Sequence, residues 1–231
     1  RPGMMSRSEN RWDSWIRDPE HARRGATARL SVLYEQLGQV EGYATYKISR
    51  DAPPPFEPRG KLIIDEMLAA TNDAHAALWR FCLDVDLIDN VESWNRPPDD
   101  PLKWRLANPR ELRRIKRDAL WIRVIDVTHA LEARRYNSSG QIVLQLNDNF
   151  CPWNQGKYIL DFHPDGATCK PTNKSADIEL DGDALASIYM GGARLSALAS
   201  AGRARELTSG SVLKSDTIFS SNPMPWCPEQ F

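Results

Sequence analysis

The sequence predicts an α+β fold divided into two regions. Stretches with the alternation of β-strands and stretches with the helical spacing of apolar residues interleave along the whole chain of 231 residues. The composition, 41% hydrophobic and 26% charged, is that of a globular protein rather than a disordered one. A new strand-and-helix pattern begins beyond residue 109, so we expect the two regions to meet near residues 113–116.

The first region opens with a helix and a β-hairpin. Ser8 can cap a helix that runs to about Arg17. Its apolar residues recur at helical spacing and form one face, for which packing against the core is the default: Trp12, Trp15 and Ile16. Residues 29–34 and 42–48 alternate around a short polar turn, which predicts two paired strands.

The rest of the first region combines strands with a helix. Residues 51–59 are rich in proline and predict a loop, and residues 61–67 predict the next strand. Thr71 can cap a helix whose apolar residues again recur at helical spacing: Ala74, Ala77, Leu78, Phe81 and Cys82. A strand is predicted at residues 87–94, and a loop containing several prolines follows at residues 96–101.

The second region combines short strands with helices. The sequence His163-Pro164-Asp165-Gly166 is a strong turn signal and predicts a hairpin, and Gly191-Gly192 separates two helices. The strands are predicted at residues 119–125, 140–146, 158–162, around 168, and 176–180. The helices are predicted at residues 128–136, 183–190, 193–201 and 211–219.

Charge and cysteine content narrow the classes of function. A formal net charge of −1 provides no basic field for nucleic acid, so we expect no nucleic-acid partner. No apolar run is long enough to span a membrane and no signal peptide opens the chain, which predicts a cytoplasmic protein without a membrane partner. The cysteines contain no C-x-x-C pair and favour reduced thiols over a disulfide framework or a zinc site: Cys82, Cys151, Cys169 and Cys227.

One glycine-containing stretch is similar to a cofactor motif but departs from it. Arg23-Arg24-Gly25-Ala26 resembles the coenzyme A pyrophosphate loop of acetyltransferases. The position three before Gly25 is Ala22, where that loop has Gln or Arg, and a strand pattern follows where a helix must begin. The four histidines are scattered, without a second metal ligand at a suitable spacing. We therefore predict neither a cofactor-binding residue nor a metal site in this chain.

Asp118 has two interpretations. It lies at the start of the predicted strand 119–125, near Trp121 and after the basic run of residues 113–117. As a residue at an exposed strand edge, it would form a surface ion pair of little energetic weight. As a carboxylate near tryptophan, it would bind a cationic amine through charge pairing and cation–π contact.

The last ten residues, 222–231, form a tail with an unusual composition. They contain three prolines and the aromatic residues Trp226 and Phe231. Prolines restrict the backbone, so the tail loses little conformational freedom on docking, and its aromatic rings offer apolar area to bury. On these residues alone, a frayed terminus and a docked terminus both stay open.

Several ordered segments resemble the Eis-like acetyltransferases, the "enhanced intracellular survival" proteins. The segments are residues 102–110, 118–123, 130–136 and 189–192, together with the terminal Phe231. In that family, a GNAT domain that binds acetyl-CoA is followed by a second GNAT-like domain and then by a domain with a sterol-carrier-protein fold.

The resemblance implies a domain assignment. Residues 1–115 would be a second GNAT-like domain that is N-terminally incomplete, and residues 116–231 a sterol-carrier-protein-like domain with a functional C-terminal tail. The chain opens on Arg1-Pro2-Gly3 without an initiator methionine, which favours the C-terminal portion of a longer protein. The acetyl-CoA site and a tyrosine general acid would then lie in a missing N-terminal GNAT domain, and the chain alone would be inactive.

The resemblance also implies roles for single residues. The α-carboxylate of Phe231 would be the general base of an N-acetyltransferase acting on polycationic amines such as aminoglycosides. Asp118, Trp12, Glu229 and Gln230 would line the substrate pocket. The family further implies a homo-oligomer, a hexamer. Two other functions stay open, namely a lipid or sterol carrier and a structural oligomerisation domain without catalysis.

Overall fold

The chain forms two compact units in the computed structural model, which describes residues 1–50 and 60–229. The N-terminal unit contains Met4–Lys116 and the described end of the tail, residues 227–229, and the C-terminal unit contains Arg1–Gly3 and Arg117–Trp226. The end of the tail thus belongs with the first region of the sequence, and not with the second, where it was predicted. The proline-rich loop predicted at residues 51–59 lies outside the described residues.

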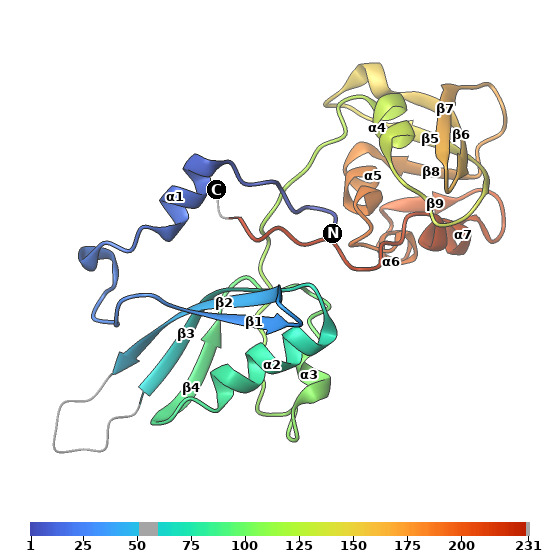
Figure 1. Ribbon diagram of the computed structural model, residues 1–231. Helices are drawn as coiled ribbons and strands as arrows, with labels where there is room; N and C mark the ends of the chain where they lie inside the picture. The colour runs from blue at the N-terminus through green and yellow to red at the C-terminus, as the bar shows by residue number, and fades with distance from the viewer. Residues whose placement is uncertain (51–59, 230–231) are drawn as a thin grey trace. The chain divides into compact units, whose positions relative to one another are not determined.

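The N-terminal unit is built on a four-stranded sheet in the order β1-β2-β3-β4 (Figure 1). The strands are β1 (Leu30–Gln36), β2 (Gln39–Arg50), β3 (Gly60–Ala69) and β4 (Ile88–Ser93). The first three are antiparallel neighbours, and β4 runs parallel to β3. The helices are α1 (Glu9–Ile16), α2 (Asn72–Leu83) and α3 (Leu102–Arg105), with a 3-10 turn at Glu20–Ala22. The predicted hairpin, strands and capped helices of this region are confirmed.

Local chemistry explains the ends of these elements. The β1–β2 hairpin turns at Leu37 and Gly38, whose φ angles of 50° and 79° are those that a two-residue hairpin turn requires. Ser8 accepts a hydrogen bond from the backbone of Arg11 at 3.3 Å and begins α1. Thr71 accepts one from the backbone of Ala74 at 3.2 Å and begins α2.

Helix α2 packs on one face of the sheet and forms the core of this unit. Ala74, Leu78 and Cys82 are buried at the helical spacing that the sequence predicts. The sheet contributes its own buried residues to the same core: Ala44, Tyr46, Leu62, Ile64 and Met67. Phe81 differs from the prediction because it is exposed, with its ring edge-on to Tyr46 at 5.8 Å between centroids.

A β-bulge changes which residues of β3 face away from α2. Thr45 pairs with Glu66 while Tyr46 pairs with Ile64, so Asp65 is an extra residue on β3. Ile64 is buried under α2, and the extra residue lets both Asp65 and Glu66 lie on the opposite face of the sheet. Two neighbouring carboxylates therefore share one face, which a regular strand would not allow.

The C-terminal unit is built on a five-stranded sheet in the order β7-β6-β5-β8-β9. The strands are β5 (Gly140–Asn147), β6 (Gly156–His163), β7 (Gly166–Pro171), β8 (Ile178–Asp181) and β9 (Ala204–Glu206). The helices are α4 (Val127–Ala133), α5 (Gly182–Tyr189), α6 (Leu195–Ser200) and α7 (Ser211–Ile218), with a 3-10 turn at Pro152–Asn154. Figure 1 shows α4 beside β7. The predicted β6–β7 hairpin and the four helices are confirmed, whereas β9 was not predicted.

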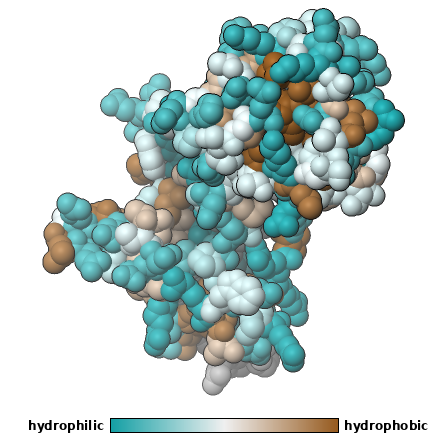
Figure 2. All heavy atoms as spheres, turned by 90° about the vertical axis from the view of Figure 1, so that its right-hand side faces the viewer, coloured by the Kyte–Doolittle hydropathy of each residue, from teal (hydrophilic) through white to brown (hydrophobic). Residues whose placement is uncertain are grey.

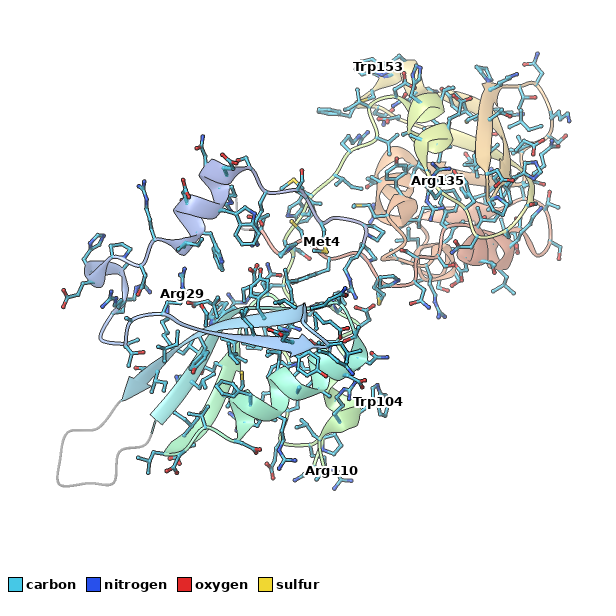
Figure 3. The ribbon with its side chains drawn as sticks, viewed as in Figure 1. Met4, Arg29, Trp104, Arg110, Arg135 and Trp153 are labelled. Carbon is cyan, nitrogen blue, oxygen red and sulfur yellow. The ribbon has the colours of Figure 1, made fainter. Side chains whose placement is uncertain are left out.

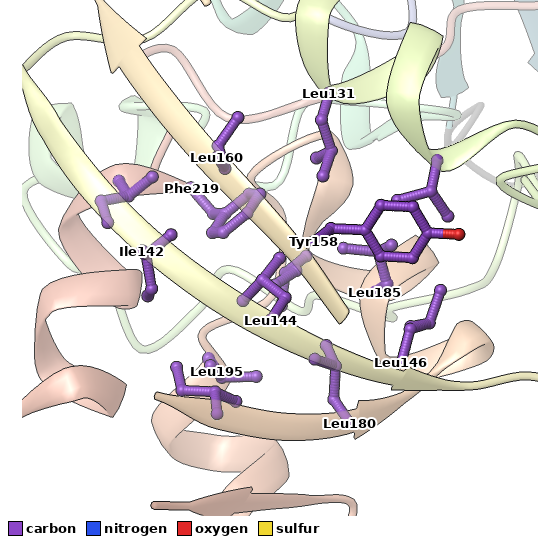
Figure 4. Close-up of a cluster of buried hydrophobic side chains, with 14 of the residues drawn as sticks. Leu131, Ile142, Leu144, Leu146, Tyr158, Leu160, Leu180, Leu185, Leu195 and Phe219 are labelled. Atoms are coloured by element: carbon purple, nitrogen blue, oxygen red, sulfur yellow. The ribbon is translucent and has the colours of Figure 1, made fainter. Parts of the chain in front are cut away.

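Side chains from strands and helices fill the core of the C-terminal unit (Figure 4). Leu144 and Leu160 from the sheet meet Leu185 from α5 and Phe219 from the end of α7, all nearly without exposed surface. A lipid or sterol carrier would need apolar helix faces that are open to a ligand. Leu185, Ile188 and Leu195 are buried in this core instead, and Leu198 packs partly buried against it. Apolar residues also reach the surface of the chain, and Figure 2 shows them as brown patches among teal hydrophilic ones.

The strand predicted at residues 119–125 is wrong. The segment alternates as predicted, with Val124 buried and Trp121 exposed, but it pairs with no strand among the described residues. Side chains take the place of a neighbouring strand, because Asn154 donates to the carbonyl of Val124 at 3.1 Å and Trp153 donates to that of Ile125 at 2.8 Å. Alternation reports which side chains are buried, not whether a partner strand exists.

Candidate functional site

Arg7 is the centre of a buried group of charged side chains in the N-terminal unit. Its Nη1 and Nη2 donate to the two oxygens of Glu66 on β3, at 2.9 and 2.5 Å. Its Nε donates to Oε1 of Glu229 in the tail at 2.6 Å. The side chain is only 7% exposed, and its guanidinium lies over the rings of Trp12 and Trp15 at 4.7 and 5.4 Å. One cation therefore joins the sheet, the tail and α1.

Glu229 is fixed at both of its carboxylate oxygens. Oε1 accepts from Arg7, and Oε2 accepts from Nε and Nη2 of Arg11 at 2.9 and 2.5 Å. Burial favours the neutral acid, but the hydrogen bonds and charges of the two arginines outweigh it and lower the pKa of Glu229. The carboxylate is thus held ionised with 7% of its side chain exposed.

Glu66 receives a third donor from the sheet. The hydroxyl of Tyr43 on β2 donates to its Oε2. Burial first, and then the hydrogen bond to Glu66, raise the pKa of Tyr43, so the phenol stays protonated and acts as a donor. The Arg7 cluster, defined as Arg7, Arg11, Tyr43, Glu66 and Glu229, therefore balances two carboxylates with two guanidinium groups.

Asp65, the neighbour of Glu66, anchors the same face at a second point. Arg29 and Lys47 bind its carboxylate at 3.1 and 3.3 Å. Arg29 lies just before β1 (Figure 3), donates to the carbonyl of Trp15, and places its guanidinium 5.0 Å from the centroid of the Trp15 ring. The two carboxylates that the bulge places on this face, Asp65 and Glu66, thus connect α1 to the sheet through Arg29 and Arg7.

The prediction that the apolar face of α1 packs against the core is wrong. None of the residues of α1 is buried, and Trp12 and Ile16 are 38% and 68% exposed. The rings of Trp12 and Trp15 contact arginine side chains instead of an apolar core. The helix is therefore held by ion pairs and cation–π contacts, which apolar periodicity does not reveal.

The structure brings two of the predicted site residues to one cluster. Trp12 and Glu229 both contact Arg7. Asp118 is exposed, starts no strand and belongs to the C-terminal unit. Gln230 and Phe231 lie outside the described residues. The roles given to these residues stay predictions.

The described part of the tail is docked rather than frayed. Trp226 is buried in the C-terminal unit, where its backbone N–H donates to the carbonyl of Pro2 at 2.9 Å. Cys227 is buried in the N-terminal unit, where its carbonyl accepts from the side chain of Asn95 at 2.9 Å. Together with Glu229, these contacts settle the question that the sequence left open for residues 222–229.

Sequence reasoning missed Arg7, Tyr43 and Glu66. One signal was available for Glu66, because the adjacent charges Asp65 and Glu66 interrupt an apolar strand and indicate a bulge. No local pattern could have paired Arg7 with Glu229, since 222 positions separate them.

Metal and membrane features are absent from the part of the chain that the structure describes. Within residues 1–50 and 60–229, no three His, Cys, Asp or Glu side chains group in a way that could hold a metal ion. Over the same ranges, no helix combines the length and the apolar character needed to cross a bilayer.

Two family models match the chain in succession. The model described as "Acetyltransferase (GNAT) domain" matches residues 3–124, and the model described as "Sterol carrier protein domain" matches residues 127–228. The α+β fold with these two domains in this order is confirmed. Because the GNAT match begins at residue 3 and extends through the N-terminal unit, the prediction that residues 1–115 are an incomplete domain is not borne out.

Named relatives include N-acetyltransferases of actinobacteria. The chain is 38% identical to an uncharacterized N-acetyltransferase of Streptomyces avermitilis, over 100% of this chain and 56% of that protein. It is 33% identical to N-acetyltransferase Eis of Mycobacterium tuberculosis, over 96% of this chain and 52% of that protein. The crystal structure of Eis1 from Mycobacterium abscessus matches 82% of this chain and 48% of its own, with a TM-score of 0.72 and 30% identity. The chain spans about half the length of the curated relatives it matches.

These matches change what the sequence implied about catalysis. A GNAT domain supports an enzyme that uses acetyl-CoA, so the expectations that the chain is inactive and that the cofactor site lies outside it are not supported. The two non-catalytic alternatives, a lipid carrier and an oligomerisation domain, are not favoured. The chain belongs to the GNAT acetyltransferase family, and within that family it is similar to N-acetyltransferase Eis.

Proposed function

We propose that the chain is part of an acetyl-CoA-dependent N-acetyltransferase that acts on amino groups of polycationic amines such as aminoglycosides. The observation that supports this most is the anchoring of Glu229, two residues before Phe231. Glu229 thus ties the described end of the tail to the Arg7 cluster, and the proposed base follows it two positions later in the sequence.

In this proposal, the α-carboxylate of Phe231 is the general base. An amine is protonated near neutral pH and must lose a proton before it attacks a thioester. An α-carboxyl with its ordinary pKa of about 3.3–3.7 is a weak base, and a docked position away from water raises its basicity. A positioned base of this kind contributes roughly 10²–10⁴-fold to the rate.

The proposed substrate contacts come from side chains whose charge or ring surface is not already used within the protein. The charge of Glu229 is neutralised by Arg7 and Arg11, so this carboxylate positions the tail instead of binding the amine. Trp12 is partly exposed and keeps ring area for a cation–π contact with an ammonium group. We propose that Asp118, which is exposed, contacts a further ammonium group of the substrate. We also propose that Gln230 makes a polar contact with the substrate.

Acetyl-CoA supplies the acetyl group when bound, but its pyrophosphate does not fit two places in the N-terminal unit. At the start of α2, the hydroxyl of Thr71 donates to Glu41 at 2.8 Å and Asp73 lies in the first turn, so carboxylates stand where phosphate would bind. The stretch at residues 23–26 leads to β1 and not to a helix. We propose that the phosphates bind elsewhere. The test is a calorimetric titration of the parent chain and of Asp73→Lys with acetyl-CoA. We expect the same dissociation constant for both, and a different one in Asp73→Lys would contradict this proposal.

The experiment for the base blocks the terminal carboxylate. One glycine is added after Phe231 in the full-length protein, and acetylation of an aminoglycoside is followed under saturating acetyl-CoA. We expect kcat to fall by about 10²–10⁴-fold, because the base is displaced from its position. Glu35→Gln, an exposed change on β1, serves as the control and should leave kcat unchanged. Unchanged turnover in the extended protein would refute the assignment of the base.

A further inference from the structure

We propose that Arg7 is a positioning residue, which sets the location of the terminal carboxylate by clamping Glu229 of the tail onto Glu66 of the sheet. This inference rests on the proposed function, since it assumes that the carboxylate of Phe231 acts in the reaction. Arg7 itself contacts no reacting atom in the proposal.

Arg7 differs from Arg11 in the number of carboxylates that its side chain binds. Its three nitrogens are all used, two on Glu66 and one on Glu229, so one rigid guanidinium fixes the distance between tail and sheet. Among the described residues, the side chain of Arg11 bonds to Glu229 but not to Glu66, and it is 45% exposed, so it does not join the tail to β3. Its guanidinium is partly in water, so its pair with Glu229 is more strongly screened than the pair that the buried Arg7 forms.

The sheet side of the clamp is rigid. Glu66 lies directly after the bulge on β3, one of the two inner strands of the sheet, is 5% exposed and also accepts from Tyr43. The tail side is fixed at a second point, where the carbonyl of Cys227 accepts from Asn95. The tail between Cys227 and Glu229 is therefore held at both ends, and Arg7 supplies the attachment nearer to the chain end.

Lysine cannot reproduce this arrangement. An ammonium group is a point charge without the planar fork that binds Glu66 at both oxygens while donating to Glu229. The Trp12 and Trp15 rings also lie over the guanidinium at distances suited to its flat face. Arg7→Lys is therefore expected to keep the charge and the fold but to loosen the tail.

The test combines Arg7→Lys and Arg7→Met with the extension of Phe231 by one glycine in the full-length enzyme. Each single change is expected to lower kcat for an aminoglycoside at saturating acetyl-CoA, by about 10-fold for Arg7→Lys and more for Arg7→Met, with KM for the amine nearly unchanged. In the extended enzyme, the Arg7 substitutions are expected to lower kcat no further, because the group they position is already displaced. Additive losses would overturn the proposal, since a merely structural effect multiplies with the extension.

A second measurement does not depend on activity. Carboxypeptidase releases Phe231 from the unextended enzyme at a rate that reports the undocked fraction of the tail. We expect at least 10-fold faster release in Arg7→Lys and less than 3-fold faster release in the matched control Arg11→Lys, because Arg11 is half exposed and reaches only Glu229. Equal rates in the parent and in Arg7→Lys would overturn the clamp.

The two measurements separate the clamp from the base. If the glycine extension leaves kcat unchanged but Arg7→Lys speeds carboxypeptidase release, the proposed base fails and Arg7 loses its catalytic meaning while still anchoring the tail. If Arg7→Met does not fold, Glu229→Gln replaces it, because that change leaves the Arg7–Glu66 pair in place. Glu229→Gln is then expected to give the same non-additive loss of kcat, and an additive loss would contradict the proposal.

Discussion

Replacing Glu66 by glutamine tests the Arg7 cluster through stability. The carboxylate of Glu66 accepts two hydrogen bonds from Arg7 and one from Tyr43, with 5% of its side chain exposed. Glutamine keeps the shape but presents one oxygen and one NH₂ group, so a donor then faces a donor. Arg7 would retain only Glu229 as a buried counter-charge.

The magnitude follows from the burial of these groups. Breaking a buried ion pair by removing one partner costs about 3–5 kcal/mol, and because the glutamine oxygen still accepts one bond, we expect about 3 kcal/mol. For a chain of this size, each kcal/mol lowers Tm by about 2–4 °C, so the N-terminal unit should melt about 6–12 °C lower.

The assay is thermal unfolding, with Glu92→Gln as the matched control. Glu92 lies on the same sheet and pairs with Lys61 at 3.0 Å, but the two side chains are 49% and 32% exposed. Exposed pairs contribute about 0–1 kcal/mol, so this control should shift Tm by less than about 4 °C. If Glu66→Gln lowered Tm no more than Glu92→Gln does, the Arg7 cluster would not be a stabilising feature.

Three further predictions concern packing, pH and thiol reactivity. Gly182→Ala places a methyl group on the buried Asp148 carboxylate and should lower the free energy of unfolding by about 1–3 kcal/mol, while Gly166→Ala, with open space around it, should change little in the same denaturant titration. Burial opposes ionisation of Asp100, but its bonds from His and Arg side chains and from the backbone lower its pKa; its stabilising contribution is present above the ordinary Asp pKa and is lost as the pH falls through the lowered value. Asp100→Asn should therefore flatten the acid side of a plot of Tm against pH, and an unchanged slope would contradict this. Burial raises the pKa of Cys82 to about 11, so at pH 8 it should react with a disulfide reagent only as fast as the protein opens; rapid labelling of the native protein would show this thiol to be accessible.

Local signals in the sequence predicted most of the elements. Ser8 and Thr71 mark helix starts because a capping hydroxyl acts within its own turn. The hairpin between β1 and β2 follows from alternation on both sides of a short turn. The strand β9, with three residues, is too short to show any period, and the segment at residues 119–125 shows a period without a partner strand.

The candidate site depended on contacts that no local pattern encodes. The family resemblance pointed to Trp12 and Glu229, but it did not show that Arg7 joins them. Residues 7 and 229 form an ion pair only because the sheet that lies between them in the sequence folds and brings them together. The adjacent charges Asp65 and Glu66 indicate a bulge in β3, but which residue is the extra one depends on the register with β2 and not on β3 alone.

The bulge has a consequence for how related sequences can differ in length. Ile64 pairs with Tyr46 and Glu66 with Thr45, so removing Asp65 would leave both pairings and the facing of both residues as they are. A one-residue gap at this position in a relative would therefore cost the attachment of Arg29 and Lys47 but leave Glu66 in place for Arg7. A deletion at this position can therefore pass through evolution without disturbing the carboxylate that receives the tail.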